Sequence, residues 1–372
     1  MVSDGRPVTD RRAWGWVQHL RHGGTTPWAD WTGTAEPGGA VVPGAQQLEL
    51  LRRLNEAGSP RPRLVQRVLG ASAPGRGQPD LELVGAASES RFGPRPVDPG
   101  TLSDVELLRV AASILAEDVV ARGLPEPPKA GRPRPWRRHY RLHGDPELVV
   151  PARTDLVARG RPPGGRAPVH VVLATDLGRM LGHLWTARAF EGGIPGWRPW
   201  LRRLERNGTL PPRIDPLHLA RTRAGRAAPD HVHVVLDPKA LPSLVGVRRA
   251  PAQVPELAAE APDLARRIGS VVALLVPDDQ RRALMRRTLR PWLAEVPGSP
   301  LTVPAEHHDW LRDHAARIAD GLSRAGYAVH GDPGGLAPVR RPGVEAPAPR
   351  ALALALRMML AEDTKETSEE EA

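Results

Sequence analysis

The sequence predicts an α/β fold, with a doubly wound and mostly parallel sheet, helices on both faces and a helical C-terminal third. Two segments carry this prediction, residues 169–174 (VHVVLA) and 231–236 (HVHVVL). Each is a short run rich in Val and Leu between turn-forming residues, which is typical of parallel strands buried on both faces. Residues 176–190 and 197–206 between them are predicted helices, so the order indicates crossover connections.

Further elements are predicted before these strands. Residues 14–20 (WGWVQHL) are expected to form a first strand, after a flexible lead at 1–12. Leucines at helical spacing predict a helix over 46–55, and 80–86 (DLELVGA) is expected to be a short strand. Ser103 followed by Glu106 is a capping-box pattern, which predicts that another helix begins there.

The rest of the chain is predicted to be largely helical. Residues 124–135 are rich in Pro and basic residues and indicate a long surface loop. Apolar residues at helical spacing predict helices over 257–268, 285–292 and 311–322. We expect one α/β domain over 13–338, followed over 339–372 by a Pro-rich linker, a short helix at 350–361 and a disordered acidic tail.

Composition excludes several classes of protein. The net charge is +10, but Arg supplies nearly all of the positive charge and is spread along the chain, so a nucleic-acid partner is not expected. The absence of Cys excludes a disulfide framework, a thiolate metal site and a cysteine nucleophile. No apolar run approaches the roughly 20 residues that cross a bilayer, and residues 1–12 lack the apolar core of a signal peptide. We therefore expect a cytoplasmic protein without a membrane partner.

The most suggestive motif is a Gly/Thr-rich turn, Arg21-His22-Gly23-Gly24-Thr25-Thr26. Between a strand and a helix, such a turn presents backbone N–H groups and hydroxyls to an anion. Pro27 fits the first turn of the following helix. The full Gly-x-x-x-x-Gly-Lys-Ser/Thr signature is missing, so an ordinary tight loop packed under neighbouring tryptophans is the alternative.

Four further residues allow two interpretations each. Asp176 and Asp237 follow the two best strands, where ligands bind in open α/β sheets, but aspartates in this position also cap the next helix. Trp197 and Trp200 are expected either to line a pocket or to pack a loop against the sheet.

The histidines do not predict a metal site. His19 and His22 flank a turn without a carboxylate or third ligand at metal spacing. His307 and His308 are expected at an exposed helix start. His170, His231 and His233 alternate with strand residues and are expected to be packed or edge histidines rather than catalytic ones.

Three stretches resemble the actinobacterial sulfotransferase-like proteins of the P-loop sulfotransferase superfamily. They are residues 171–185 (VVLATDLGRMLGHLW), residues 210–235, and residues 310–338 with their Gly-Tyr-x-Val-x-Gly-Asp segment. The resemblance implies a sulfotransferase-like α/β domain that transfers a sulfuryl group to a hydroxyl acceptor. It also implies 3′-phosphoadenosine 5′-phosphosulfate as the donor.

The resemblance also assigns roles to residues. The donor loop of the family reads Pro-Lys-Thr-Gly-Thr-Thr. Gly24, Thr25 and Thr26 match it, Gly23 replaces a threonine, and His22 stands where the family has its lysine. His22 is thus the implied catalytic residue, and Arg21 with residues 23–26 would hold phosphate.

The second donor contact of the family is an Arg and a Ser eight residues apart, which bind the 3′-phosphate. These positions fall on Thr175 and His183 in this chain, and Arg179 lies one helical turn from Thr175. The resemblance therefore implies that Thr175, Arg179 and His183 bind the donor.

We expect, accordingly, a protein that binds a phosphorylated nucleotide or another small anionic ligand, with sulfuryl transfer as its chemistry. The alternative is a catalytically inactive relative that keeps the fold as a binding or scaffold module. In that case the helix at 350–361 would engage a protein partner.

Overall fold

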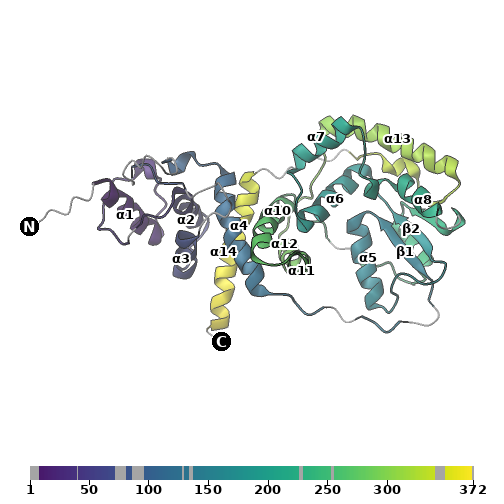
Figure 1. The fold of residues 1–372 in the computed structure, drawn as a ribbon, viewed down its shortest axis with the longest axis horizontal. Coiled ribbons are helices and arrows are strands. Elements are labelled where there is room, and N and C mark those ends of the chain that lie inside the picture. The colour runs from purple at the N-terminus through teal and green to yellow at the C-terminus, as the bar shows by residue number, and fades with distance from the viewer. Residues whose placement is uncertain are drawn as a thin grey trace, which may run out of the picture. The chain divides into compact units, whose positions relative to one another are not determined.

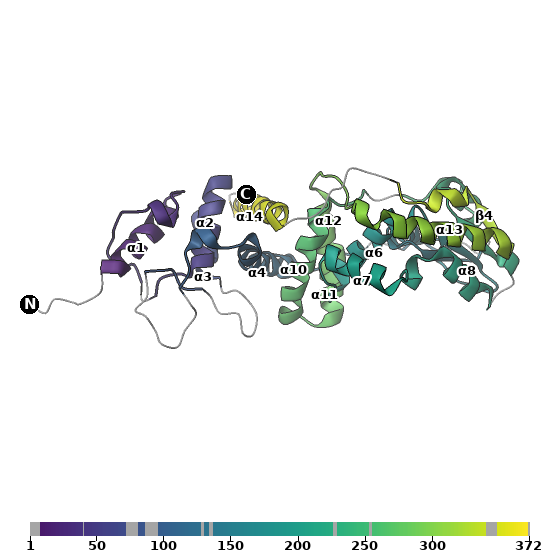
Figure 2. The same cartoon turned by 90° about the horizontal axis from the view of Figure 1, so that it is seen from above.

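The computed structural model describes residues 8–39, 41–71, 81–85, 96–127, 130–133, 137–225, 229–252, 255–339 and 348–370 (Figure 1 and Figure 2). The chain forms two compact units. The helical unit comprises residues 1–123, 264–289 and 346–372, and the sheet unit comprises residues 124–263 and 290–345. The structure thus divides the domain predicted over 13–338 between two compact units, because both ends and part of the middle of the chain build a separate helical core.

The sheet unit contains a parallel sheet in the order β1-β2-β3-β4. The strands are β1 (Tyr140–Gly144), β2 (Val169–Leu173), β3 (Val232–Val235) and β4 (Ala328–His330). β2 and β3 are the two strands predicted from the Val-rich runs. β1 (YRLHG) and β4 (AVH) were not predicted as strands, because polar or short segments lack the apolar run that marks a buried strand.

Helices cover both faces of this sheet, which confirms the predicted α/β class. On one face, Val171, Leu173 and Val235 pack against α5 (Pro146–Ala158) and α9 (Leu241–Val245). On the other face, Val172 and Val234 pack against α6 (Leu177–Glu191), α8 (Pro216–Ala224) and α13 (His308–Ala325). Burial of each of these side chains stabilises the sheet by about 1.5–3 kcal/mol.

The second face also holds α7 (Trp197–Asn207), whose Trp197 and Trp200 lie in the same core cluster. Of the two interpretations for these tryptophans, packing is therefore the one that the structure supports. Trp185 and Trp197 lie with ring centroids 5.6 Å apart, and Trp197 and Trp200 are also 5.6 Å apart. Such tilted and stacked contacts stabilise aromatic clusters beyond simple burial.

The helical unit contains α1 (Val8–Arg21), α2 (Ala45–Ala57), α3 (Pro62–Gly70), α4 (Asp104–Arg122) and α14 (Ala348–Glu370). α4 and α14 pack along each other, and α2 packs against both (Figure 1). The remaining helices are α10 (Glu260–Leu275), α11 (Asp278–Leu284), the π-helical turn η6 (Met285–Leu289) and α12 (Arg290–Ala294). The short 3₁₀ turns are η1 (Trp28–Asp30), η2 (Pro99–Thr101), η3 (Pro212–Ile214), η4 (Pro229–His231), η5 (Pro238–Ala240), η7 (Ala305–His307) and η8 (Pro333–Leu336).

Several predicted elements differ from the structure. Residues 14–20 are helical in α1 and not a strand, because Trp16, Val17 and Leu20 recur at helical spacing and are buried together. Within 80–86, residues 81–85 carry only an isolated bridge from Leu83 to Val97, and the two end residues lie outside the described part. The acidic tail was predicted to be disordered, but α14 continues to Glu370.

Other predictions can be judged only in part. Helix α4 begins after Ser103 as predicted, although the Ser103 side chain makes no capping hydrogen bond. Of the lead at 1–12, residues 8–12 belong to α1, and residues 1–7 lie outside the described part. None of the helices in the described ranges is both long and apolar enough to cross a bilayer.

Candidate functional site

The predicted anion loop follows a helix and not a strand. The backbone N–H of His22 donates to the carbonyls of Gln18 and His19, that of Gly23 to Leu20, and that of Gly24 to His19. These amides therefore close the C-terminal end of α1. The C-terminus of a helix carries partial negative charge, so the environment opposes anion binding. The expected phosphate cradle over residues 21–26 is corrected on this ground.

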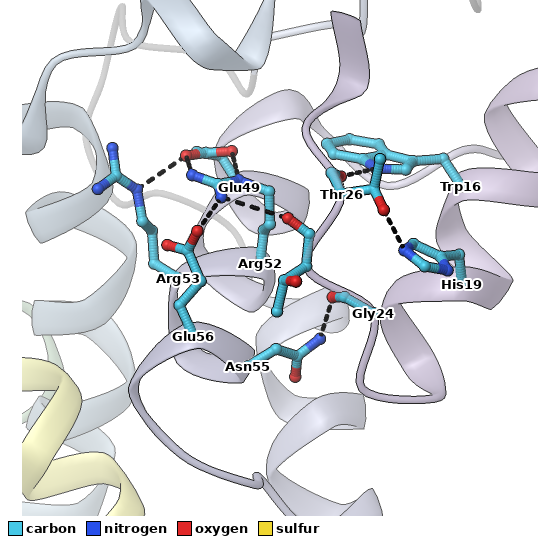
Figure 3. A network of polar contacts seen from close by, with 10 residues as sticks. Trp16, His19, Gly24, Thr26, Glu49, Arg52, Arg53, Asn55 and Glu56 are labelled. Atoms are coloured by element: carbon cyan, nitrogen blue, oxygen red, sulfur yellow. Dashed lines mark hydrogen bonds and ion pairs between the residues drawn. The ribbon is translucent and has the colours of Figure 1, made fainter. Parts of the chain in front are cut away.

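The oxygens of the loop are also engaged by neighbouring side chains (Figure 3). Asn55 Nδ2 donates to the Gly24 carbonyl over 2.8 Å, and Trp16 Nε1 donates to the Thr26 carbonyl over 2.9 Å. The Thr26 hydroxyl lies 3.1 Å from His19 Nε2. The loop is thus tied into the helical unit, as the alternative of an ordinary packed loop predicted.

The exposed side chains of the loop also show no donor site. Arg21, His22 and Thr25 are exposed, and His22 Nδ1 lies 2.7 Å from the Gln18 carbonyl, which draws its ring back onto the helix. Arg52 donates to the Thr25 carbonyl over 3.4 Å. These residues do not fit the phosphates of 3′-phosphoadenosine 5′-phosphosulfate, and no catalytic step is derived through His22.

The other predicted site residues lie in the sheet unit, at the carboxyl end of β2. Thr175 follows the strand, and Asp176 caps α6 by accepting a hydrogen bond from the Arg179 N–H over 2.9 Å. Asp237 likewise accepts from the Lys239 N–H over 3.0 Å, so capping is the observed role of both aspartates. The loop residues 21–26 and this group belong to different compact units.

A buried ion network occupies this edge of the sheet. Asp145, which is fully buried after β1, accepts a hydrogen bond from His183 Nδ1 over 2.7 Å. The other ring nitrogen, Nε2, lies 3.3 Å from Glu256 Oε1, in an ion pair that lacks the alignment of a hydrogen bond. The Arg179 guanidinium also pairs with Glu256. His183 and Arg179, two of the three residues predicted here, therefore meet on one carboxylate.

The network fixes the protonation of its members. Burial lowers the pKa of His183, but the hydrogen bond to Asp145 and the negative charges of Asp145 and Glu256 outweigh burial and raise that pKa to about 9. Burial raises the pKa of Glu256, whereas His183 and Arg179 lower it to about 2. Two cations and two carboxylates thus balance one another at neutral pH.

Sequence reasoning missed Asp145 and Glu256. Asp145 sits in the sequence Gly144-Asp145-Pro146-Glu147, which is a helix-start pattern of Asp then Pro, and the Asp145 side chain does cap α5 by accepting from the Glu147 N–H. That signal was available once β1 was recognised. Glu256 stands in an irregular segment without any local signal, so only the tertiary structure places it.

Two clefts open beside this network. The apolar cleft is lined by Glu147, Leu148, Ala152, Leu173, Ala174, Val235, Pro238, Leu241, Ala250, Pro251 and Ala252. The polar cleft is lined by Asp176, Gly178, Arg179, Leu301, Thr302, Val303, His308, Pro338 and Val339. Both lie at the carboxyl ends of the strands, the edge at which open α/β sheets bind ligands.

The remaining candidate histidines are structural. His307 and His308 are buried, contrary to the prediction of an exposed helix start, because His307 Nδ1 contacts Glu205 over 2.8 Å and His308 Nε2 contacts the Val303 carbonyl over 3.1 Å. His233 contacts His330 across two strands over 3.0 Å. Among the described residues, no three His, Cys, Asp or Glu side chains gather as a metal site requires.

The His183 network predicts that the sheet unit loses stability at alkaline pH. A group whose pKa is raised on folding, here from 6.5 to about 9, stabilises the fold fully below pH 6.5 and loses that effect as the pH rises through 9. We expect the free energy of unfolding to fall by up to about 3 kcal/mol over this range. Urea unfolding at a series of pH values measures it.

The variant His183→Gln should remove this alkaline slope, and His218→Gln, at an exposed position in α8, should keep it. An unchanged slope in His183→Gln would assign the effect to another group and contradict the charged state derived for His183.

Comparison with known proteins adds no relative: no family model matches the chain, and neither a curated protein nor a solved structure is significantly similar to it. The site must therefore be interpreted from its own chemistry.

Proposed function

We propose that the carboxyl edge of the sheet unit binds a small organic anion. Its apolar body would lie in the apolar cleft, and its anionic group would pair with Arg179 and His183. The observation that carries this proposal is the convergence of these two cations on the single carboxylate of Glu256.

The position of that carboxylate has the properties of an anion site. Arg179 and His183 lie four residues apart on one face of α6, and Arg179 is in its first turn. The N-terminal end of a helix carries partial positive charge, which adds to the charges of the two side chains. An arginine at such a site suits carboxylate, sulfonate and phosphate groups, because its guanidinium donates two parallel hydrogen bonds.

Glu256 pairs with Arg179 but leaves the Arg179 guanidinium accessible from the polar cleft. Its side chain is 21% exposed, and the Arg179 side chain is 37% exposed and lines the polar cleft. An external anion can therefore reach Arg179 and replace Glu256 there without leaving an unpaired charge on either cation. Asp145, by contrast, is fully buried and would stay on His183 in both states.

The apolar cleft supplies the second half of the site. All of its lining residues except Glu147 are apolar, as is typical of small-molecule pockets. The floor is made by Leu173, Ala174 and Val235 at the ends of β2 and β3. Glu147 and Ala252, which line the cleft, stand two and four residues along the chain from Asp145 and Glu256. A largely apolar pocket beside groups with shifted pKa values is typical of a binding or active site.

Sulfonated and phosphorylated compounds belong to the proposed ligand class, which links the site to the resemblance noted in the sequence. Arg179 and His183 are both residues that the resemblance assigned to the donor. The loop at 21–26 gives that donor no support, so sulfuryl transfer and the scaffold alternative both stay predictions.

Two fluorescent probes test the proposal. 8-Anilinonaphthalene-1-sulfonate joins an apolar ring system to a sulfonate, and N-phenyl-1-naphthylamine has the same rings without the charge. We expect saturable binding of both, and weakening of both by Ala250→Phe at the cleft rim. Arg179→Gln should weaken only the sulfonate probe, by about tenfold, and Glu256→Gln should strengthen only that probe because its competitor is removed.

Glu295→Gln and Ala316→Phe, at exposed positions of the same unit, are the matched controls and should change neither probe. If Arg179→Gln weakened both probes equally, the proposed pairing of the ligand's anionic group with Arg179 would be contradicted. No saturable binding of either probe would overturn it.

A further inference from the structure

The positive charge of the chain is divided unequally between its two units. The sheet unit has 29 Lys and Arg against 20 Asp and Glu, a net charge of +9, whereas the helical unit has 23 against 22, a net charge of +1. Along the sequence this charge is diffuse. Whether these basic residues form a positive surface patch therefore depends on the fold.

Six arginines lie around β1 and define the β1 arginine cluster: Arg137, Arg138, Arg141, Arg153, Arg161 and Arg223. They come from β1, from the segments before β1 and after α5, and from α5 and α8. Convergence is closest at Gly246, where a Cβ atom would lie 3.2 Å from Arg138 Cγ and 3.2 Å from Arg161 Nη1.

These arginines lack carboxylate partners. Within the described part of the chain, no Asp or Glu pairs with any of the six, and three acids that follow β1 and belong to or cap α5 are used elsewhere. Asp155 pairs with Arg159, Asp145 with His183, and Glu147 with Arg290. The Nε atoms of Arg137 and Arg223 are buried without a hydrogen-bond partner. A group of cations left uncompensated in this way creates a strongly positive potential.

The positive potential acts on the pKa values of two neighbouring groups, His143 and Tyr140. Burial, together with the positive charges of Arg223, His170 and Arg141, lowers the pKa of His143 to about 4. Burial raises the pKa of Tyr140 to about 12, against the opposing effect of Arg137, Arg161 and Arg153. The two residues lie on opposite faces of β1, so the positive potential extends around this strand.

We propose that the β1 arginine cluster binds the sugar-phosphate backbone of a nucleic acid. Several guanidinium groups without a carboxylate partner match a chain of repeated phosphates, each of which accepts two parallel hydrogen bonds from Arg. Of these groups, Arg138 donates one hydrogen bond to the Ser243 carbonyl over 2.6 Å, and a carbonyl leaves its positive charge uncompensated. β1 is the last strand of the sheet order, its outer edge carries a single bridge from Tyr140 to Gly164, and the arginines lie near both of its faces. A flexible polyphosphate strand can follow such an edge, whereas a flat bilayer contacts one side only.

The cluster would bind the sugar-phosphate backbone without sequence-specific contacts to the bases. Tyr140 is fully buried, and its hydroxyl donates to the Arg161 carbonyl over 2.5 Å, so its ring offers no stacking platform. The cluster lies at the amino ends of the strands, and the two clefts lie at the carboxyl ends. This inference therefore stands independently of the proposed ligand site.

Fluorescence anisotropy with a labelled oligothymidylate tests the proposal in the full-length protein. We expect the affinity to fall between about 50 and 200 mM salt, since counterions compete with phosphate contacts. The double variant Arg138→Ala/Arg161→Ala should reduce the slope of log affinity against log salt by about 1.4, or about 0.7 for each lost contact with a single strand. Arg138→Lys/Arg161→Lys should bind with an intermediate affinity, because charge remains without bidentate geometry.

The control is Arg202→Ala/Arg203→Ala, which removes the same charge from exposed positions in α7 and should leave the slope unchanged. An equal loss in the control would show that net charge alone binds the strand, and would overturn the proposal. Absence of binding at the lowest salt would do so as well. Tighter binding to phosphatidylserine vesicles than to the oligonucleotide would assign the cluster to a membrane surface instead.

Discussion

Alanine at position 144 is expected to unfold the sheet unit, at a cost above about 4 kcal/mol. Gly144 ends β1 with φ +104°, and a Cβ atom there would lie 2.1 Å from the Leu173 carbonyl oxygen and 3.0 Å from its carbon. That oxygen belongs to the central strand β2 and accepts a hydrogen bond from the Asp145 N–H over 3.0 Å. Because both partners are backbone atoms in a paired sheet, neither can move aside as a flexible side chain would.

Gly208 provides the matched control for this variant. It has φ +62°, and nothing lies within 4 Å of its Cβ position. Gly208→Ala therefore imposes only the left-handed conformation, at a cost of about 1–2 kcal/mol. Urea unfolding of both variants measures the difference. Equal costs would show that the approach of β1 to β2 at Gly144 is less close than the structure indicates.

Removal of the Asp145 carboxylate is expected to cost about 3–5 kcal/mol, since it leaves the charged His183 buried beside a single partner. The variant Asp145→Ala also deletes the α5 cap, worth about 1 kcal/mol. Asp145→Asn keeps an acceptor for that cap and should cost less. Stability at pH 7, measured by denaturant titration, provides the comparison.

The variant Asp237→Ala measures the cost of losing a helix cap alone, without the loss of a histidine counter-ion. Asp237 caps η5 in the same way but is exposed and has no histidine partner in the described part of the chain. Its loss should cost about 1 kcal/mol. A cost for Asp145→Ala no larger than this would contradict the role of Asp145 as the buried counter-ion of His183.

Of the two predicted parts of the site, residues 175–183 lie at the expected sheet edge, whereas the loop at 21–26 does not follow a strand. Residues 175–183 follow a strong Val-rich strand, so the sequence places them at the carboxyl edge of a sheet, where Arg179 and His183 are found. The loop at 21–26 was interpreted through the apolar run before it. Trp14, Trp16 and Val17 fit a strand or a buried helix equally over so short a stretch, and tertiary packing selected the helix.

That selection reverses the electrostatics of the loop. After a strand and before a helix, Gly23 and Gly24 would present free amides at the positive end of a helix dipole. After α1, the same amides bond backwards to helical carbonyls at the negative end. One error in secondary structure thus changes a predicted anion site into a helix terminus.

The sequence by itself determined the α/β class, the two central strands, most helices and the position of Arg179 and His183 after β2, because these depend on local apolar patterns. Only the tertiary structure decided the division into two units, the partners Asp145 and Glu256, and the gathering of dispersed arginines around β1. These features join residues far apart in the chain, such as Asp145 with His183 and Arg138 with Arg161. Pairing over such separations depends on how helices and strands pack, and no local pattern in the chain encodes it.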